Sequence, residues 1–173
     1  PGALIYVLSV NFVSRSVDSW FNVRIEQALE GGLNLGRNTL DYVSADLLEK
    51  ARAMARELGD TPLIRRSARL DELREQSGAA SATLFSSAGR VLSTSSAATR
   101  LVPPLPSPSQ LRQARQGAGF AAVESDVDAG LTVRALVFVG SGALASDAPV
   151  LQLNQPLPAS LAQNAEAVQS AYR

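Results

Sequence analysis

The sequence predicts an α+β fold in which a long N-terminal helix precedes a five-stranded, mainly antiparallel sheet and a C-terminal helix. Apolar residues recur at steps of three and four over residues 14–58, as in a helix that buries one face, and after residue 80 the pattern becomes alternating, as in strands. The 173 residues, 46% apolar and 18% charged, suffice for one hydrophobic core. We therefore expect a single domain over residues 14–173, with a body at residues 60–157 and a final helix at residues 158–173.

The N-terminal helix, residues 14–58, is predicted to be longer than a small domain can cover. At 1.5 Å per residue it would extend roughly 65 Å. Its apolar positions fall into two runs, which are Phe21, Ile25, Ala28 and Gly32, and then Leu40, Val43, Leu47, Ala51, Met54 and Leu58. Such steps resemble those of a coiled coil, and an uncovered apolar stripe usually marks an interface. We therefore expect a homodimer in which the first runs of two chains pair.

Three glycines, Gly31, Gly32 and Gly36, separate the two runs. In a helix interior they would cost about 3 kcal/mol relative to alanine, so another interaction must compensate. One interpretation is a kink or a register break at this point. The other is that Gly32 and Gly36, one turn apart, let a second helix approach closely, which adds both to the candidate dimer face.

The first thirteen residues form an uncharged, mostly apolar segment. They are too few to cross a hydrocarbon core of about 30 Å. They can be the end of a first transmembrane helix or its junction with the domain that follows. A hydrophobic strand or a helix start buried in the core is an equally good interpretation.

Glycine, proline and serine positions divide the body into elements. The long helix is expected to stop in the Gly-Asp-Thr-Pro sequence at residues 59–62, and Ser67 can cap a second helix that ends before Gly78. Ser107 or Ser109 can cap a further short helix. Alternating patterns predict five strands, at residues 81–85, 90–94, 120–125, 131–139 and 150–155.

The composition argues against several classes of function. Lys plus Arg and Asp plus Glu both number 16, which argues against nucleic acid as a partner. Histidine and cysteine are absent, and a nucleophilic serine would depend on Lys50, the sole lysine. The acidic run at residues 124–130 lacks the glycine and the glutamate of a calcium loop, so it is interpreted as a solvated hairpin. We predict no catalytic residue, no metal site and no cofactor.

Arg134 is the strongest candidate for a binding residue. It lies in the middle of the strand predicted at residues 131–139, where a guanidinium is costly unless it is paired. One interpretation is a salt bridge to a carboxylate of the long or last helix, or an edge position that reaches water. The other is a guanidinium that faces a pocket for an anionic small-molecule ligand, with Thr132 and Thr83 on the same face.

Four segments resemble the sensor region of NtrY-type nitrogen-regulation sensor histidine kinases. They are residues 16–37 (SVDSWFNVRIEQALEGGLNLGR), 82–92 (ATLFSSAGRVL), 150–158 (VLQLNQPLP) and 164–172 (NAEAVQSAY). The resemblance covers nearly the whole chain. Together with the order of the predicted elements, it implies a PAS-like (PDC/Cache-type) sensor domain.

The resemblance also implies where this domain acts. It would lie in the periplasm, outside the inner membrane of a bacterium, between two transmembrane helices. The kinase module, which uses ATP, and the response regulator that it controls would lie in the cytoplasm. We therefore expect a non-catalytic sensor that answers a small molecule or another cue by moving its first helix against its last. The alternative is a ligand-free scaffold that dimerises through the long helix.

Overall fold

The computed structural model describes residues 31–32, 34–97, 104–126, 130–140 and 147–158. These residues fall into two compact units, Pro1–Thr39 with Gln163–Arg173, and Leu40–Ala162. In the first unit the described residues are helical, and the Thr39 hydroxyl donates a hydrogen bond of 2.8 Å to the carbonyl of Leu35. The second unit contains the sheet and the elements that pack on it.

The second unit is built on one antiparallel sheet of five strands. Along the chain these are β1 (Ser81–Phe85), β2 (Val91–Ser96), β3 (Phe120–Asp126), β4 (Gly130–Phe138) and β5 (Val150–Pro156). In space the order is β2-β1-β5-β4-β3, and neighbouring strands are antiparallel throughout. All five predicted strands are confirmed, with small shifts at their ends. The last strand in the sequence therefore lies in the middle of the sheet.

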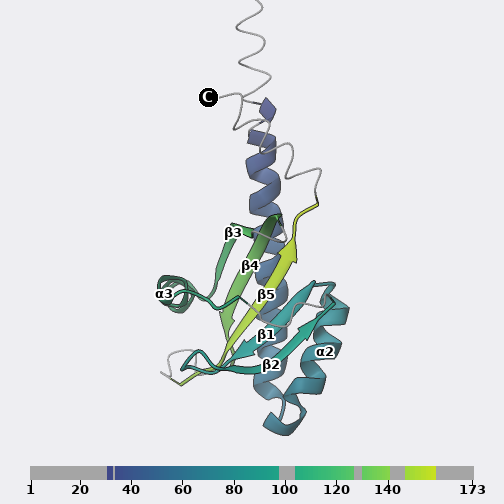
Figure 1. The fold of residues 1–173 in the computed structure, drawn as a ribbon, viewed down its shortest axis with the longest axis vertical. Coiled ribbons are helices and arrows are strands. Elements are labelled where there is room, and N and C mark those ends of the chain that lie inside the picture. The colour runs from purple at the N-terminus through teal and green to yellow at the C-terminus, as the bar shows by residue number, and fades with distance from the viewer. Residues whose placement is uncertain (1–30, 33, 98–103, 127–129, 141–146, 159–173) are drawn as a thin grey trace, which may run out of the picture. The chain divides into compact units, whose positions relative to one another are not determined.

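The long helix buries its second apolar run against one face of this sheet (Figure 1). Ala51 and Leu58 are fully buried, and Leu47 and Met54 are 3% exposed. They pack with α2 (Arg66–Ser77) and with side chains of β1, β4 and β5 such as Leu153. The second run is therefore confirmed as a stripe that faces the core, and its burial contributes hydrophobic stabilisation on this face.

The end of the long helix lies at residue 60, close to the predicted position. Gly59 occupies the last turn, where the chain after β4 passes very near. A Cβ at Gly59 would lie 3.0 Å from the Cα of Gly140, so a larger residue would push the two segments apart. The glycine is therefore required by this close approach as well as by the helix stop that follows it.

A short 3₁₀ helix, η1 (Leu63–Arg65), determines where α2 begins. The predicted cap Ser67 is wrong, because α2 starts at Arg66 directly after η1 and no side chain caps it. Ser67 lies inside the helix, where its hydroxyl accepts a hydrogen bond of 3.0 Å from Ser93. The end of α2 matches the prediction, since Gly78 adopts the left-handed conformation with φ of 70°.

Arg69 connects α2 to the long helix. Its guanidinium donates hydrogen bonds to Glu72 of α2, at 2.6 Å, and to Glu57 of the long helix. These bonds, to Glu72 and then to Glu57, raise the pKa of Arg69 above its ordinary value. The cluster lies on the surface, so it adds an electrostatic link to helices that the core already holds together.

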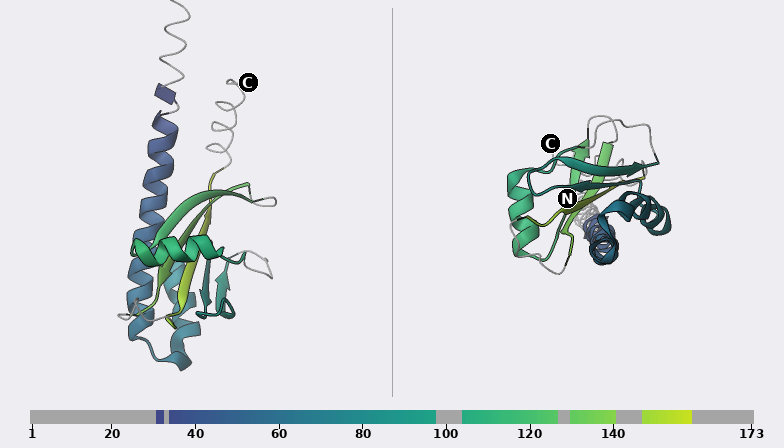
Figure 2. Two further views of the ribbon diagram at one scale, coloured as in Figure 1. Left: turned by 90° about the vertical axis from the view of Figure 1, so that its left-hand side faces the viewer. Right: turned by 90° about the horizontal axis from the view of Figure 1, so that it is seen from below.

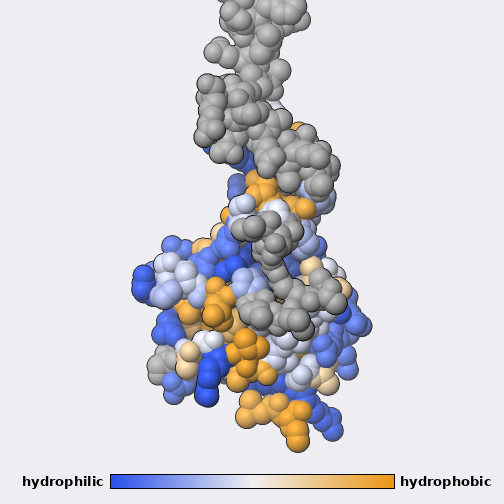
Figure 3. Space-filling view, in the orientation of Figure 1, coloured by the Kyte–Doolittle hydropathy of each residue, from blue (hydrophilic) through white to orange (hydrophobic). Residues whose placement is uncertain are grey.

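The turn between the long helix and α2 exposes two apolar side chains. Leu63 is 79% exposed and Ile64 is 92% exposed, and Figure 3 shows this apolar area at the bottom of the view. Neither residue belongs to the hydrophobic core. Leu63 is therefore a surface leucine against which substitutions of core leucines can be compared.

Several predicted features lie outside the described residues. They are residues 1–13, the dimer positions Phe21, Ile25 and Ala28, and the helix predicted at residues 158–173 beyond its first residue. Gly32 and Gly36 are described. Both are helical and exposed, and a Cβ at either would meet nothing within 4 Å, so pairing through them stays a prediction. Among the described helices, none combines the length and the apolar content needed to cross a bilayer.

Candidate ligand-binding site

Strand alternation gathers polar side chains on the face of the sheet opposite the long helix. In the register of the sheet, Thr83 of β1 lies beside Gln152 of β5, and Asn154 of β5 lies beside Arg134 of β4. Neighbours in register point to the same side, and so do residues two positions apart on one strand. Thr132 therefore belongs to the same face. Gln152 and Thr83 are fully buried, and Asn154 is 8% exposed.

The remainder of this face is apolar and is covered by α3 (Pro108–Gln116), which runs across the strands (Figure 2). Leu111 and Ala114 of α3 pack against Phe85, Leu136 and Phe138. The first turn of α3 reaches the polar side chains, because Gln110 contacts Arg134. The helix therefore covers the apolar half of the face, and the polar half lies near its N-terminus.

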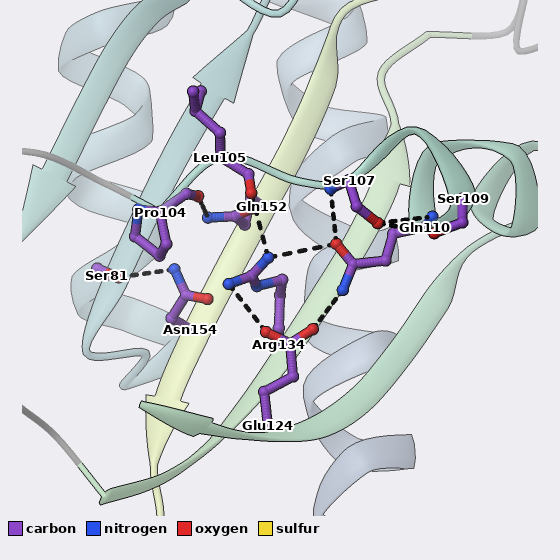
Figure 4. A network of polar contacts seen from close by, with 10 residues as sticks. All are labelled: Ser81, Pro104, Leu105, Ser107, Ser109, Gln110, Glu124, Arg134, Gln152 and Asn154. Carbon is purple, nitrogen blue, oxygen red and sulfur yellow. Dashed lines mark hydrogen bonds and ion pairs between the residues drawn. The ribbon is translucent and has the colours of Figure 1, made fainter. Parts of the chain in front are cut away.

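Arg134 is paired inside the sheet, as Figure 4 shows. Its side chain is 12% exposed, and its Nη2 atom lies 2.9 Å from a carboxylate oxygen of Glu124. The expected salt bridge to the long or last helix is wrong, because the partner comes from β3. Ala122 of β3 is the register partner of Arg134, so Glu124, two residues further on, points to the same face within reach. Arg134 is thus largely buried and paired, as the cost of an unpaired guanidinium in mid-strand requires.

Gln110 joins this ion pair to the start of α3. Its side-chain carbonyl accepts a hydrogen bond of 3.3 Å from Nη1 of Arg134, and its side-chain amide donates to Glu124. The same carbonyl accepts from the backbone N–H of Ser107 at 2.8 Å, which completes a capping box with the Ser107 hydroxyl. Ser107 is thus confirmed as the cap, in preference to Ser109.

Four buried polar atoms in this cluster have no hydrogen-bond partner within the described structure. They are Thr132 Oγ1, Arg134 Nε, Gln152 Oε1 and Asn154 Oδ1. The orientation of Gln152 is fixed, since its Nε2 atom donates a hydrogen bond of 2.9 Å to the carbonyl of Pro104. A buried polar atom without a partner costs about 1–3 kcal/mol, so four on one face indicate a site that another molecule completes.

The arrangement offers both donors and acceptors but little net charge. Arg134 presents an N–H group, whereas Gln152 and Asn154 present carbonyl oxygens that receive no hydrogen bond from the described residues. Because Glu124 neutralises Arg134, the cluster contains one positive and one negative group. A ligand with an acceptor and one or more N–H or O–H donors fits these atoms better than a simple anion does.

The sequence prediction found part of this cluster. Arg134, Thr132 and Thr83 do share a face, although the hydroxyl of Thr83 already shares a hydrogen bond of 3.2 Å with that of Thr94. Four contributors were missed, namely Gln110, Glu124, Gln152 and Asn154. The alternation of leucine with Gln152 and Asn154 could have revealed two of them, since polar residues on a central strand must face a polar environment.

Glu124 was missed because it was assigned to a solvated acidic hairpin. The hairpin itself is confirmed, because β3 and β4 pair antiparallel there, but the Glu124 side chain is only 30% exposed and is paired with Arg134. Among the described residues, no group of three or more Asp and Glu side chains is placed to hold a metal ion.

No protein-family model and no curated protein matches this chain. Solved structures do match. The ligand-binding domain of Campylobacter jejuni chemoreceptor Tlp3 in complex with L-valine has a TM-score of 0.53 at 15% identity, and the match covers 76% of this chain and 60% of that one. The sensory domain of the same chemoreceptor matches with a TM-score of 0.54 at 15% identity, covering 76% and 61%. The chain thus spans about 60% of the length of these similar structures.

The fold is therefore that of the PAS-like, Cache-type sensor domains. It is defined here by a five-stranded antiparallel sheet with the last strand in the middle. A long N-terminal helix lies on one face of the sheet and a short helix on the other. The predicted fold class is confirmed.

Proposed function

We propose that this chain is a non-catalytic sensor domain that binds a small molecule on the polar half of the sheet face. The observation that carries this proposal is the set of four buried polar atoms around Arg134 that have no partner among the described residues. It is supported by the fold, since the similar Tlp3 structures are described as a ligand-binding and sensory domain. No step of this function requires a cofactor.

The ligand we favour is a small zwitterion such as an amino acid. Its carboxylate would accept from Arg134, and its ammonium group would donate to Gln152 Oε1, Asn154 Oδ1 or the Glu124 carboxylate. The neutral balance of the cluster argues for such a ligand over the plain anion that Arg134 alone would favour. The Tlp3 domain has been solved with L-valine and with isoleucine, which is consistent with this class.

For the parent protein we propose an NtrY-type sensor histidine kinase of nitrogen regulation. The four resembling segments support this proposal. The domain would then be periplasmic, and flanking transmembrane helices would transmit its ligand state to the cytoplasmic kinase and, through it, to a response regulator. A ligand can drive such a change only if it binds two arrangements of the domain with different affinity.

Thermal unfolding in the presence of each of the common amino acids tests the proposed ligand class. We expect at least one of them to raise the Tm, and isothermal titration calorimetry should then give one site per chain. Asn154→Leu should abolish this shift, whereas Gln113→Leu, a change at an exposed position of α3, should keep it. If no amino acid raises the Tm at millimolar concentration, the proposed function is wrong.

A second candidate function is a scaffold that pairs through the long helix without a ligand. It is favoured by Leu35, which is 69% exposed and lies on the helix next to Gly32 and Gly36. Residues three and four apart share a helix face, so these positions offer a second helix an apolar contact with open space beside it. Cysteine crosslinking at Leu35 against Arg37 on another face tests it, and equal crosslinking at both would exclude a defined pair.

A further inference from the structure

The segment that precedes α3, together with the first turn of this helix, is held on the polar cluster by hydrogen bonds. We call residues 104–110 the strap. The carbonyl of Pro104 accepts a hydrogen bond of 2.9 Å from Gln152, and that of Leu105 accepts one of 3.5 Å from Nη1 of Arg134. The Leu105 residue is 64% exposed, so apolar burial contributes little to holding this part of the strap. Its position depends on the side chains of the cluster (Figure 4).

Gln110 is the residue through which the cluster and the helix start meet. Its carbonyl oxygen has two lone pairs, and both are used, one by the backbone N–H of Ser107 and one by Arg134. Its amide nitrogen donates to Glu124. The orientation of this amide is determined, because the two donors and the carboxylate leave only one consistent assignment.

We propose that Gln110 is a positioning residue that couples the Arg134–Glu124 ion pair to the N-terminus of α3. A ligand that accepts a hydrogen bond from Nη1 of Arg134, or donates one to the Glu124 oxygen that Gln110 contacts, competes directly with Gln110 for these atoms. Once the Gln110 amide is displaced, it no longer accepts from Ser107, and the capping box of α3 opens. Ligand occupancy is thereby converted into a change in order at the strap and the first turn of α3. This regulation rests on the proposed function of the cluster.

Hydrogen exchange of the 173-residue chain, followed by mass spectrometry on peptides from residues 104–116, tests the coupling without any ligand. Arg134→Met should raise amide exchange at the start of α3 about five-fold, the factor expected for the loss of one stabilising hydrogen bond. Gln110→Met should raise it by a similar factor. The double variant should show little more exchange than either single variant, because both changes break the same connection.

Two further variants keep this test decisive. Glu124→Gln takes the place of Arg134→Met if that variant does not fold. It disturbs the ion pair by a smaller change and should also raise exchange in the same peptides. Arg115→Met is the matched control, since Arg115 lies on the same helix, over the ring of Phe138 at 4.9 Å, and has no contact with Arg134 among the described interactions. Its effect should add to that of Arg134→Met.

Additive effects of Gln110→Met and Arg134→Met would overturn the coupling. The same exchange measurement with an amino acid present separates this proposal from the proposed function. L-Valine is the first probe, and it is replaced by another amino acid if only that one raises the Tm. If the amino acid raises the Tm but leaves exchange at residues 104–116 unchanged, the coupling is wrong and the binding function stands. If no amino acid binds, the proposed function fails. The comparison of the single and double variants then still decides whether Gln110 couples the ion pair to the start of α3.

Discussion

Replacing Asn154 by leucine should make the protein more stable and less able to bind its ligand. Asn154 is 8% exposed on the central strand, and its Oδ1 atom has no partner among the described residues. Removing this oxygen relieves about 1–3 kcal/mol, while losing the 3.3 Å hydrogen bond from Nδ2 to Ser81 costs about 0.5–1.5 kcal/mol. Leucine has a similar size, so we expect a net gain of about 1 kcal/mol in the free energy of unfolding, or about 2–4 °C in Tm.

Gln155→Leu provides the matched control on the same strand. The side-chain carbonyl of Gln155 accepts a hydrogen bond of 3.1 Å from the backbone N–H of Ala80, so its removal leaves that donor unpaired and should lower stability by about 1 kcal/mol. Urea unfolding of both variants measures the difference. A loss of stability in Asn154→Leu as large as in Gln155→Leu would mean that Asn154 is a satisfied structural residue, and the argument for a ligand site would fail.

Three further predictions concern the fold. Leu58→Ala should cost about 2–5 kcal/mol in urea unfolding, because Leu58 is fully buried, whereas Leu63→Ala should change stability by less than about 0.5 kcal/mol; equal effects would contradict the described core. Gly119→Ala should cost about 1–3 kcal/mol, since φ is 138° there and a Cβ would lie 2.8 Å from Leu48; an unchanged Tm would refute that conformation. Arg69→Gln should lower the Tm only at low ionic strength, and equally at all pH values from about 6 to 9, because the raised pKa of Arg69 keeps its stabilisation present below the ordinary arginine pKa. An effect that persists at about 1 M salt would show that its role is not electrostatic.

Local features of the sequence were sufficient to predict most of the fold. The run from Leu40 to Leu58 identified the core-facing stripe of the long helix, because helical spacing alone decides which residues share a face. Alternation identified the five strands, and the two candidate caps, Ser107 and Ser109, placed the start of α3 to within two residues. Each of these depends on neighbours within a few positions of one another. The start of α2 was predicted wrongly at Ser67, because η1 formed ahead of it.

The candidate site, in contrast, was decided by the tertiary structure. The sequence singled out Arg134, but its partner Glu124 could be assigned only once β3 and β4 were paired in a definite register, since a shift of one residue would turn either side chain to the other face. Gln110 and Gln152 lie far apart in the chain, and they join one cluster because β5 inserts between β1 and β4 while α3 crosses that face. Helical and strand periods are properties of short segments, whereas strand order and register are determined by the packing of the whole core.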